Sequence, residues 1–187
     1  MGLRKDALSA AAEWIAVVEK TAREDPDRSG DSDLVATVGR IHCEPNAANV
    51  IAGTVKVSLD VRSSRDSVRD AAVAELLDRA AEIAAMRGLQ LESRQLMDQP
   101  AIPMDEQLTA WLAEAVEAAG FPGRRMPSGA GHDAMEMATR VPTAMLFLRS
   151  PGGISHHPAE AVLEEDVEAA LQAGQFFLRR MAAQCTT

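Results

Sequence analysis

The sequence predicts an α/β protein made of two consecutive parts, residues 1–98 and residues 99–187. Three observations support this prediction. Apolar residues recur with a helical period in several segments, they alternate with polar residues in others, and the pattern changes after Asp98. With 187 residues, of which 47% are hydrophobic and 25% charged, the chain can bury a sizeable core in one ordinary domain or two small ones.

The first part begins with a predicted helix and two predicted strands. Apolar residues at three- and four-residue steps predict a helix from Arg4 to about Arg23, and the polar run Glu24–Asp33 ends it. Leu34–Cys43 is predicted to be a strand, and Asn49–Arg62 a second one with one apolar and one polar face. The apolar face of this second strand carries Val55, Val57, Leu59 and Val61.

A second helix and a third strand complete the first part. Ser64–Arg87 has the helical period and Gly88 follows it as a natural stop, whereas Leu89–Leu96 alternates weakly and is predicted to be a strand. The order helix, strand, strand, helix, strand matches a ferredoxin-like βαββαβ unit without its first strand. Because that strand is normally central in the sheet, the remaining strands are expected to leave an open edge or gap.

The second part is predicted to combine three helices with one buried strand. Helices are expected at Asp105–Ala119, at about Asp133–Thr139 and at Glu164–Met181, with the glycine-, proline- and serine-rich segment Gly120–Gly131 before the short one. Thr143–Leu148 is a continuous apolar run, as expected of a strand that is buried on both faces of an α/β sheet.

Charge and cysteine content exclude several classes of protein. The net charge of −9, from 19 basic and 28 acidic residues, argues against a nucleic-acid or anionic-membrane partner. Cys43 and Cys185 lie far apart without a CxxC spacing, which excludes a zinc knuckle and is typical of reduced thiols in a cytosolic protein. The sequence shows neither an apolar leader nor a run of 18 apolar residues, so we expect a cytoplasmic protein that does not span a membrane.

Histidines and glycines gather around the predicted buried strand. His132 precedes the strand, and His156 and His157 follow it in GGISHHPAE. Loops at the carboxyl ends of strands bind ligands in open α/β sheets, and neutral histidine is a common ligand of zinc and manganese. From the residues alone, a metal site and an ordinary surface histidine pair both explain this pattern.

Two sequence blocks resemble a known family. PSGAGHDAMEMA at 127–138 and PTAMLFLRSPGGISHHPAE at 142–160 resemble, in order and spacing, the allantoate amidohydrolases and the N-carbamoyl-amino-acid hydrolases. These enzymes belong to the metallohydrolase superfamily that contains aminoacylases and carboxypeptidases. GHDAM and LFLRSPGGISH are most similar to the allantoate branch. MGLRKDALSAAAEWI resembles the start of the family's first lid helix, and EPNAANVIAGTVKVSLDVRS resembles its lid-strand motif.

The resemblance implies a fold for each part. Residues 1–98 correspond to an incomplete ferredoxin-like lid, or dimerisation, domain without its first strand. Residues 99–187 correspond to the C-terminal portion of a phosphorylase/hydrolase-like α/β catalytic domain. Two departures from the family pattern are minor: the usual NVIPG is NVIAG, and Ser63 stands where a histidine often follows the motif arginine.

The resemblance also implies roles for individual residues. His156 corresponds to the metal ligand of the family's ISH-x-P-x-E motif, and His157 to a variable neighbour. Asn49 and Arg62, thirteen residues apart, correspond to the lid residues that hold the substrate's carboxylate and carbonyl. A guanidinium suits a carboxylate because it can bind both oxygens, although an ion pair with Asp60 would also explain Arg62.

His132 and Asp133 are implied to line the same site. His132 is assigned to substrate binding, whereas Asp133 either lines the site or caps the helix that follows it. No catalytic residue is assigned, because the family's general base and its lid histidine, which lies in an HAG-x-x-PM motif, precede the counterpart of Met1. The family's remaining metal ligands, which are two histidines, a bridging aspartate and a glutamate, also precede the counterpart of Met1.

The expected function follows from this correspondence. The complete enzyme would use two divalent ions, Mn²⁺ or Zn²⁺, to hydrolyse a linear C–N bond of a small ureido acid, and allantoate is the expected substrate. N-carbamoyl-L-amino acids and ureidoglycolate are the alternative substrates. We expect a homodimer formed through the lid and little or no activity of the chain by itself.

Three origins of such a chain are open at this stage. The chain can be an enzyme half that complements a separate N-terminal chain, or a non-catalytic dimerisation fragment. It can also be the product of a gene whose start is wrongly assigned or that has degraded.

Overall fold

The computed structural model describes residues 5–23, 33–155 and 157–184, and the structural statements below concern these residues. The predicted helix start at Arg4, most of the Glu24–Asp33 loop, His156 and Cys185 lie outside them. The chain divides into two compact units, Met1–Ala101 and Ile102–Thr187, and each is described by itself. That the first unit is a lid and the second a catalytic part stays a prediction.

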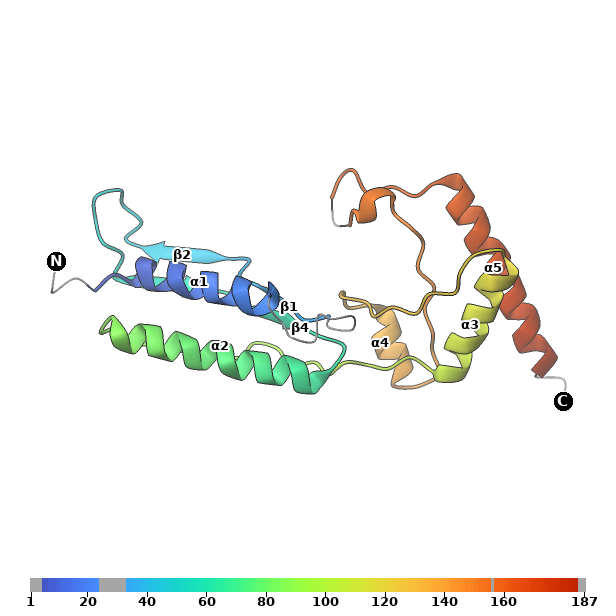
Figure 1. Ribbon diagram of the computed structural model, residues 1–187, viewed down its shortest axis with the longest axis horizontal. Helices are drawn as coiled ribbons and strands as arrows, with labels where there is room; N and C mark the ends of the chain where they lie inside the picture. The colour runs from blue at the N-terminus through green and yellow to red at the C-terminus, as the bar shows by residue number, and fades with distance from the viewer. Residues whose placement is uncertain (1–4, 24–32, 156, 185–187) are drawn as a thin grey trace. The chain divides into compact units, whose positions relative to one another are not determined.

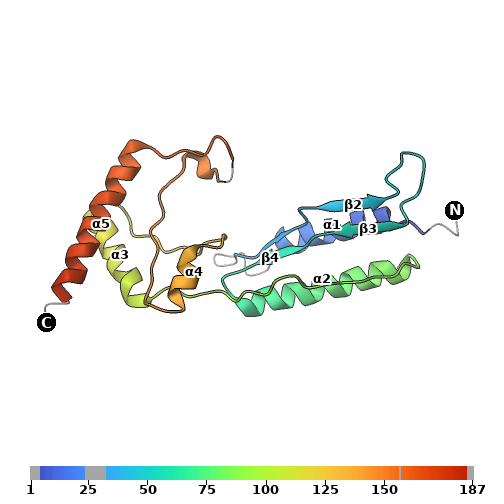
Figure 2. The same ribbon diagram turned by 180° about the vertical axis from the view of Figure 1, so that it is seen from behind.

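The first unit consists of two helices and a long β-hairpin. Val35–Thr37 pairs antiparallel with Asp60–Arg62, and Ile41–Glu44 pairs antiparallel with Thr54–Val57. The Ser58 N–H donates to the Arg40 carbonyl at 3.0 Å, so the two ladders follow one another along one hairpin. The elements are α1 (Ala7–Arg23), β1 (Val35–Thr37), β2 (Ile41–Glu44), β3 (Thr54–Val57), β4 (Asp60–Arg62) and α2 (Asp66–Met86), shown in Figure 1 and from behind in Figure 2.

The two predicted strands of this hairpin are each interrupted. Leu34–Cys43 and Asn49–Arg62 were expected to be continuous, but β1 and β2 are separate, as are β3 and β4. Between the two ladders, residues 38–40 stand opposite residues 58 and 59, which is one extra residue on the first strand. At this point the Arg40 N–H donates to the Ser58 hydroxyl at 3.0 Å. A serine side chain that competes with the backbone in this way ends the regular ladder.

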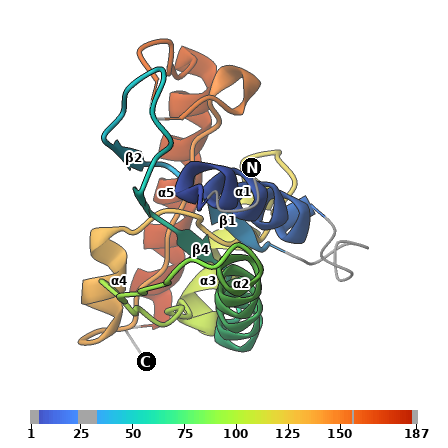
Figure 3. The same cartoon turned by 90° about the vertical axis from the view of Figure 1, so that its left-hand side faces the viewer.

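The predicted alternation of β3 and β4 is confirmed. Val55, Val57, Leu59 and Val61 are half-buried, whereas Thr54, Lys56, Asp60 and Arg62 on the other face are exposed. The apolar face packs on α1 and α2, which lie side by side in Figure 3. The core between them consists of Ala10, Trp14, Val18, Leu76 and Ile83, with Leu76 fully buried.

A hydrogen bond inside this core joins the two helices. The Trp14 Nε1–H donates to the Leu76 carbonyl at 2.8 Å, in a buried position. A buried indole N–H needs such a partner, because leaving it unpaired would cost about 1–3 kcal/mol. α1 therefore docks on α2 with one fixed register.

Leu89–Leu96 does not form the predicted third strand. Leu89 ends the turn after α2, where its N–H donates to the Ala84 carbonyl at 2.9 Å, and residues 89–96 have no ladder partner among the described residues. An extended segment becomes a strand only when a neighbouring strand takes its hydrogen bonds. The alternation of the sequence could not reveal whether that neighbour is present.

Arg69 ties the start of α2 to the segment that leaves the first unit. Its mostly buried guanidinium donates to Asp66 Oδ1 at 2.8 Å, Asp98 Oδ1 at 3.0 Å and the Gln99 carbonyl at 2.5 Å. Burial of Arg69 lowers its pKa, but the hydrogen bond to Asp70 and the charges of the surrounding carboxylates raise it. These effects outweigh burial, so the pKa of Arg69 is raised above its ordinary value. Residues 98 and 99 are thereby anchored on α2.

The second unit is mainly helical. α3 (Glu106–Ala118) and α5 (Glu164–Gln184) pack against each other, and each contains one small buried residue, Ala115 and Ala173 respectively. The Asp105 carboxylate accepts from the Leu108 N–H at 2.8 Å and so caps α3. The elements are α3 (Glu106–Ala118), α4 (Asp133–Ala138), the 3₁₀ turn η2 (Pro151–Gly153) and α5 (Glu164–Gln184).

The predicted buried strand Thr143–Leu148 is wrong for the described residues. The segment has no strand hydrogen bonds apart from one contact, in which the Asp105 N–H donates to the Thr143 carbonyl at 2.8 Å. Leu146, Phe147 and Leu148 are 40–47% exposed. An apolar run is buried on both faces only when strands flank it, and none of the described residues supplies such a strand.

Among the described residues, no helix combines the length and the apolar character that a membrane span requires.

The core of the first unit is tested by two neighbouring leucines of α2. Leu76→Ala removes a fully buried side chain and should lower the free energy of unfolding by about 2–5 kcal/mol, because a cavity remains. Leu77→Ala is the matched control: the same substitution, one residue along, at a side chain that is 37% exposed, should cost less than about 1 kcal/mol. Urea unfolding measures both, and equal losses would contradict the described packing.

Arg69 is tested against Arg79 on the same helix. Arg69→Met leaves the Asp66 and Asp98 carboxylates without their shared partner and should cost about 1–2 kcal/mol of unfolding free energy. Arg79→Met removes an exposed pair with Glu82 and should change it by less than about 0.5 kcal/mol. Faster proteolysis near residue 99 in the Arg69 variant alone would confirm the anchoring, and identical behaviour of the two variants would refute it.

Candidate functional site

Asn49 and Arg62, the predicted substrate residues of the first unit, are both exposed but lie far apart. Asn49 is in the turn between β2 and β3, where the Val50 N–H donates to the Ala47 carbonyl at 3.2 Å. Arg62 is the last residue of β4, opposite Val35 at the open end of the hairpin. From Thr54 to Arg62 the path covers eight residues, or roughly 26 Å at about 3.3 Å per residue. Figure 1 shows the turn between β2 and β3 at one end of the hairpin and β4 at the other.

Arg62 already holds a carboxylate. Its Nε and Nη2 donate to the two oxygens of Asp60 at 2.6 and 3.0 Å. The hydrogen bond from Arg62 lowers the pKa of Asp60, burial opposes this effect, and the positive charge of Arg62 adds to it, so that the pKa is lowered. The same bond raises the pKa of Arg62. This is the ion pair that the residues alone also suggested, and it shows that the guanidinium is oriented for two-oxygen recognition.

Ser63 has a structural partner. Its hydroxyl donates to Asp33 Oδ1 at 2.8 Å, and the Ser64 N–H donates to Asp33 Oδ2 at 2.5 Å. Burial raises the pKa of Asp33, but the hydrogen bonds from Ser64 and Ser63 outweigh burial and the pKa is lowered. Asp33 therefore fixes the turn that follows Arg62. This contact could not be predicted from the sequence, because its partners are at least thirty residues apart.

His132 lies at the N-cap position of α4, and its ring is held on two sides. Its Nε2 is 2.8 Å from the Ser128 hydroxyl, and its ring meets Phe147 edge-on, with centroids 6.0 Å apart. Asp133 is the first helical residue, not the cap, and the described structure records no capping bond from His132. The capping role considered for Asp133 is therefore not what the structure shows. Ser128 was not singled out from the sequence, because its contact with His132 is made in a loop, where spacing carries no signal.

The GGISHHPAE loop is built on glycine conformations. Gly152 and Gly153 have φ of 72° and 66°, a region that other residues rarely adopt. His157 Nδ1 accepts from the Ala159 N–H at 3.1 Å, so this ring is used by its own loop. His156, the predicted metal ligand, is outside the described residues. Its role is therefore a prediction that the geometry does not test.

The described side chains do not by themselves fit a metal pair. Among them, no three His, Cys, Asp or Glu residues gather closely enough to hold an ion. A dinuclear centre needs several ligands arranged around both ions. The described part of the chain therefore does not contain such a centre.

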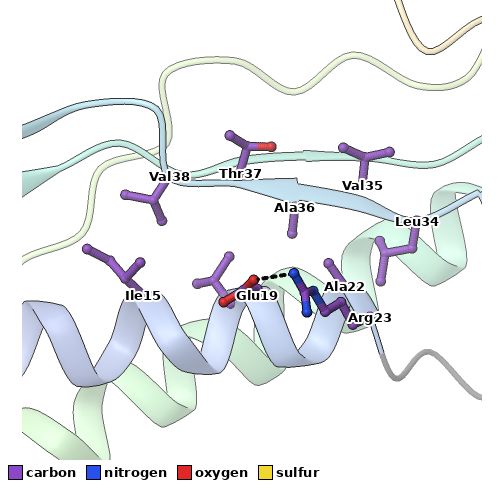
Figure 4. Close-up of a pocket in the computed structure, with 10 residues that line it drawn as sticks. Ile15, Glu19, Ala22, Arg23, Leu34, Val35, Ala36, Thr37 and Val38 are labelled. Atoms are coloured by element: carbon purple, nitrogen blue, oxygen red, sulfur yellow. Dashed lines mark ion pairs between the residues drawn. The ribbon is translucent and has the colours of Figure 1, made fainter. Parts of the chain in front are cut away.

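An apolar groove in the first unit is a separate feature. It measures about 390 Å³ and runs between α1 and β1, as Figure 4 shows. Ile15, Leu34, Ala36 and other apolar side chains line it, and the Glu19–Arg23 ion pair, at 2.7 Å, is its charged feature. It contains none of the predicted site residues, so it is not the candidate site.

The Asp60–Arg62 pair predicts a pH dependence. Because the pKa of Asp60 is lowered in the folded chain, the pair contributes its full stability above the unfolded carboxyl pKa of about 3.9. That contribution is lost as the pH falls through the lowered value. In an NMR titration, Arg62→Gln should move the Asp60 midpoint back towards its ordinary value. Arg40→Gln on the same hairpin is the control, and an unmoved midpoint in Arg62→Gln would contradict the pairing.

Comparison with known proteins identifies the family. Residues 9–180 match the family described as peptidase family M20/M25/M40. The chain is 38% identical to an allantoate deiminase of Arabidopsis thaliana over 191 residues, covering 91% of this chain and 36% of that protein. A solved amidase of the hydantoinase/carbamoylase family from Burkholderia multivorans is 34% identical with a TM-score of 0.85, covering 95% of this chain and 42% of the other.

A more distant structure shares the fold alone. A Bacillus subtilis protein described as a dinuclear metal-binding peptidase of the same family is 20% identical with a TM-score of 0.59, covering 92% of this chain and 45% of that one. The chain thus spans about two fifths of the length of the proteins it matches. These likenesses confirm the predicted α/β fold class. The chain belongs to peptidase family M20/M25/M40.

Proposed function

We propose that this chain provides the C-terminal part of an amidohydrolase that cleaves a linear C–N bond of a ureido acid. Allantoate is the favoured substrate, and N-carbamoyl-L-amino acids or ureidoglycolate are the alternatives. The observation that carries the proposal is Arg62, whose guanidinium is oriented for a carboxylate within the motif shared with the family. The relative described as an allantoate deiminase supports the substrate class.

Arg62 would bind the carboxylate of the substrate. It is exposed on the polar face of the hairpin, and its guanidinium already lies against two carboxylate oxygens of Asp60. A substrate carboxylate would replace Asp60 on that edge or approach another edge of the planar cation. His132 would contact the ureido group, because its ring is held in place next to a glycine-rich backbone.

Asn49 and Arg62 would act on one substrate only as residues of two different copies. Thr54 and Arg62 are separated along the hairpin by roughly 26 Å at about 3.3 Å per residue, and Asn49 lies in the turn beyond Thr54. This span exceeds the length of any small ureido acid. A dimer formed through the first unit would bring the turn of one copy to the open end of the other. This geometry supports the expected homodimer.

Metal chemistry would depend on groups beyond the described residues. His156 is proposed as one ligand of two divalent ions, manganese or zinc, which would supply an activated water in the complete enzyme. The described side chains form no group of three or more ligands for these ions. The chain by itself is therefore proposed to have little or no activity, and a separate N-terminal polypeptide would complete the site.

A non-catalytic dimerisation fragment is the second candidate. The same lack of a ligand cluster among the described residues favours it, as does the unpaired segment 89–96 of the first unit. A dimer that binds no metal and never gains activity would have this role. The two candidates are separated by reconstitution.

Reconstitution tests the proposed function. We expect the chain, co-expressed with the N-terminal part of a family relative and supplied with Mn²⁺ or Zn²⁺, to release ammonia from allantoate. Arg62→Gln should lower kcat/KM about fivefold, since an ion pair of a half-exposed arginine contributes up to about 1 kcal/mol. Arg79→Gln, in the exposed pair on α2, is the control and should have no effect. A stable complex without ammonia release would favour the dimerisation fragment.

A further inference from the structure

The Ser128 hydroxyl is the meeting point of three polar contacts. It lies 3.0 Å from the Ala130 carbonyl, 3.2 Å from the Ala130 N–H and 2.8 Å from His132 Nε2. All three partners belong to the PSGAGHDA segment that precedes α4. Ser128 is half-buried, whereas His132 is exposed.

The hydroxyl has one proton and two lone pairs, and this limits how the contacts can be made. The Ala130 N–H can only donate, so it uses one lone pair. The Ala130 carbonyl can only accept, so it takes the hydroxyl proton. The remaining lone pair faces His132 Nε2, which must then carry a proton and donate it. If the Ser128 hydroxyl instead donated its proton to His132 Nε2, the hydroxyl oxygen and the Ala130 carbonyl oxygen would lie 3.0 Å apart without a proton between them.

A second contact fixes the plane of the ring. Phe147 meets the imidazole edge-on, with a centroid distance of 6.0 Å and an angle of 60° between the rings. Aromatic pairs prefer this geometry, which contributes about 0.5–1.5 kcal/mol. The hydrogen bond at Nε2 and the contact with Phe147 leave the imidazole ring of His132 little freedom to flip by rotation about its bond to the backbone.

We propose that Ser128 is a positioning residue that holds neutral His132 as its Nε2–H tautomer. Nδ1 is then the atom with a lone pair, and it accepts a hydrogen bond from an N–H group of a ureido ligand. The second statement rests on the proposed function, in which His132 contacts that ligand. The first rests on the contacts of Ser128 alone.

The tautomer is read directly from the full chain by NMR. With ¹⁵N-labelled histidine at about pH 8.5, where an ordinary imidazole is neutral, long-range ¹H–¹⁵N correlations identify the protonated ring nitrogen. We expect Nε2–H alone in the wild-type chain and a mixture of tautomers in Ser128→Ala. Ser128→Thr, which keeps the hydroxyl, should restore the wild-type signals.

Ser150→Ala is the matched control. This serine also donates to a loop carbonyl of the same unit, that of Ile154 at 2.8 Å, but it does not contact His132. Its loss should leave the His132 signals unchanged. A wild-type ring found mainly as Nδ1–H, or ring signals that Ser128→Ala does not alter, would overturn the assignment of Ser128.

Titration with N-carbamoylglycine tests the ligand contact separately. The Nδ1 signal of His132 should move on binding, and Ser128→Ala should weaken the apparent Kd about five- to tenfold, as expected for one hydrogen bond. An Nδ1 signal that stays still while other signals respond would overturn this contact. Binding that neither Arg62→Gln nor His132→Phe weakens would instead contradict the proposed function and leave the tautomer result intact.

Discussion

One-sided burial of the β-hairpin is the constraint on which the first unit depends. Half of the side chains of β3 and β4 must face α1 and α2, because Val57, Leu59 and Val61 pack on the core around Leu76. A shift of one residue in the pairing would turn every apolar side chain outwards. The burial therefore also determines that Asp60 and Arg62 point away from the helices. The orientation of Arg62, the proposed substrate residue, therefore follows from the packing of the apolar face.

The second unit lacks the equivalent constraint. Its apolar run Thr143–Leu148 has strand-like composition, yet its leucines and phenylalanine are substantially exposed. Polar contacts order this region instead. Two Arg149 N–H groups donate to the buried Asp166 carboxylate, and Asp105 caps α3. Such contacts fix local geometry, but they do not bury the apolar run. An additional strand beside it would remove that surface from water.

Local patterns predicted the helices well and the strands poorly. The predicted helices at 64–87, 105–119 and 133–139 differ from α2, α3 and α4 by one or two residues at their ends, because helical hydrogen bonds lie within the segment itself. The strands depend on partners that the sequence pattern does not name. Leu89–Leu96 and Thr143–Leu148 lack those partners among the described residues, and Ser58 breaks a ladder that the alternation of apolar residues predicted to be continuous.

In the candidate site as well, some features could be predicted from the sequence and others could not. Arg62 and its alternative partner Asp60 were both visible in the sequence, because they are neighbours on one face of a strand. Asn49 was paired with Arg62 by motif spacing, which does not reveal that the turn and β4 lie at different ends of the hairpin. Ser128 was missed because its contact is made in a loop, where no periodicity signals it. His156 stays a prediction.

The Asp60–Arg62 pair also determines how a substrate can gain from Arg62. Both side chains are about half exposed, so water screens the pair and its own contribution to stability is small. A substrate carboxylate that displaces Asp60 exchanges one ion pair for another, and the net affinity from that exchange alone is modest. The gain must come from contacts that Asp60 cannot make, such as those to the ureido group. Arg62 would therefore select for a carboxylate, while the other site residues would provide most of the binding energy.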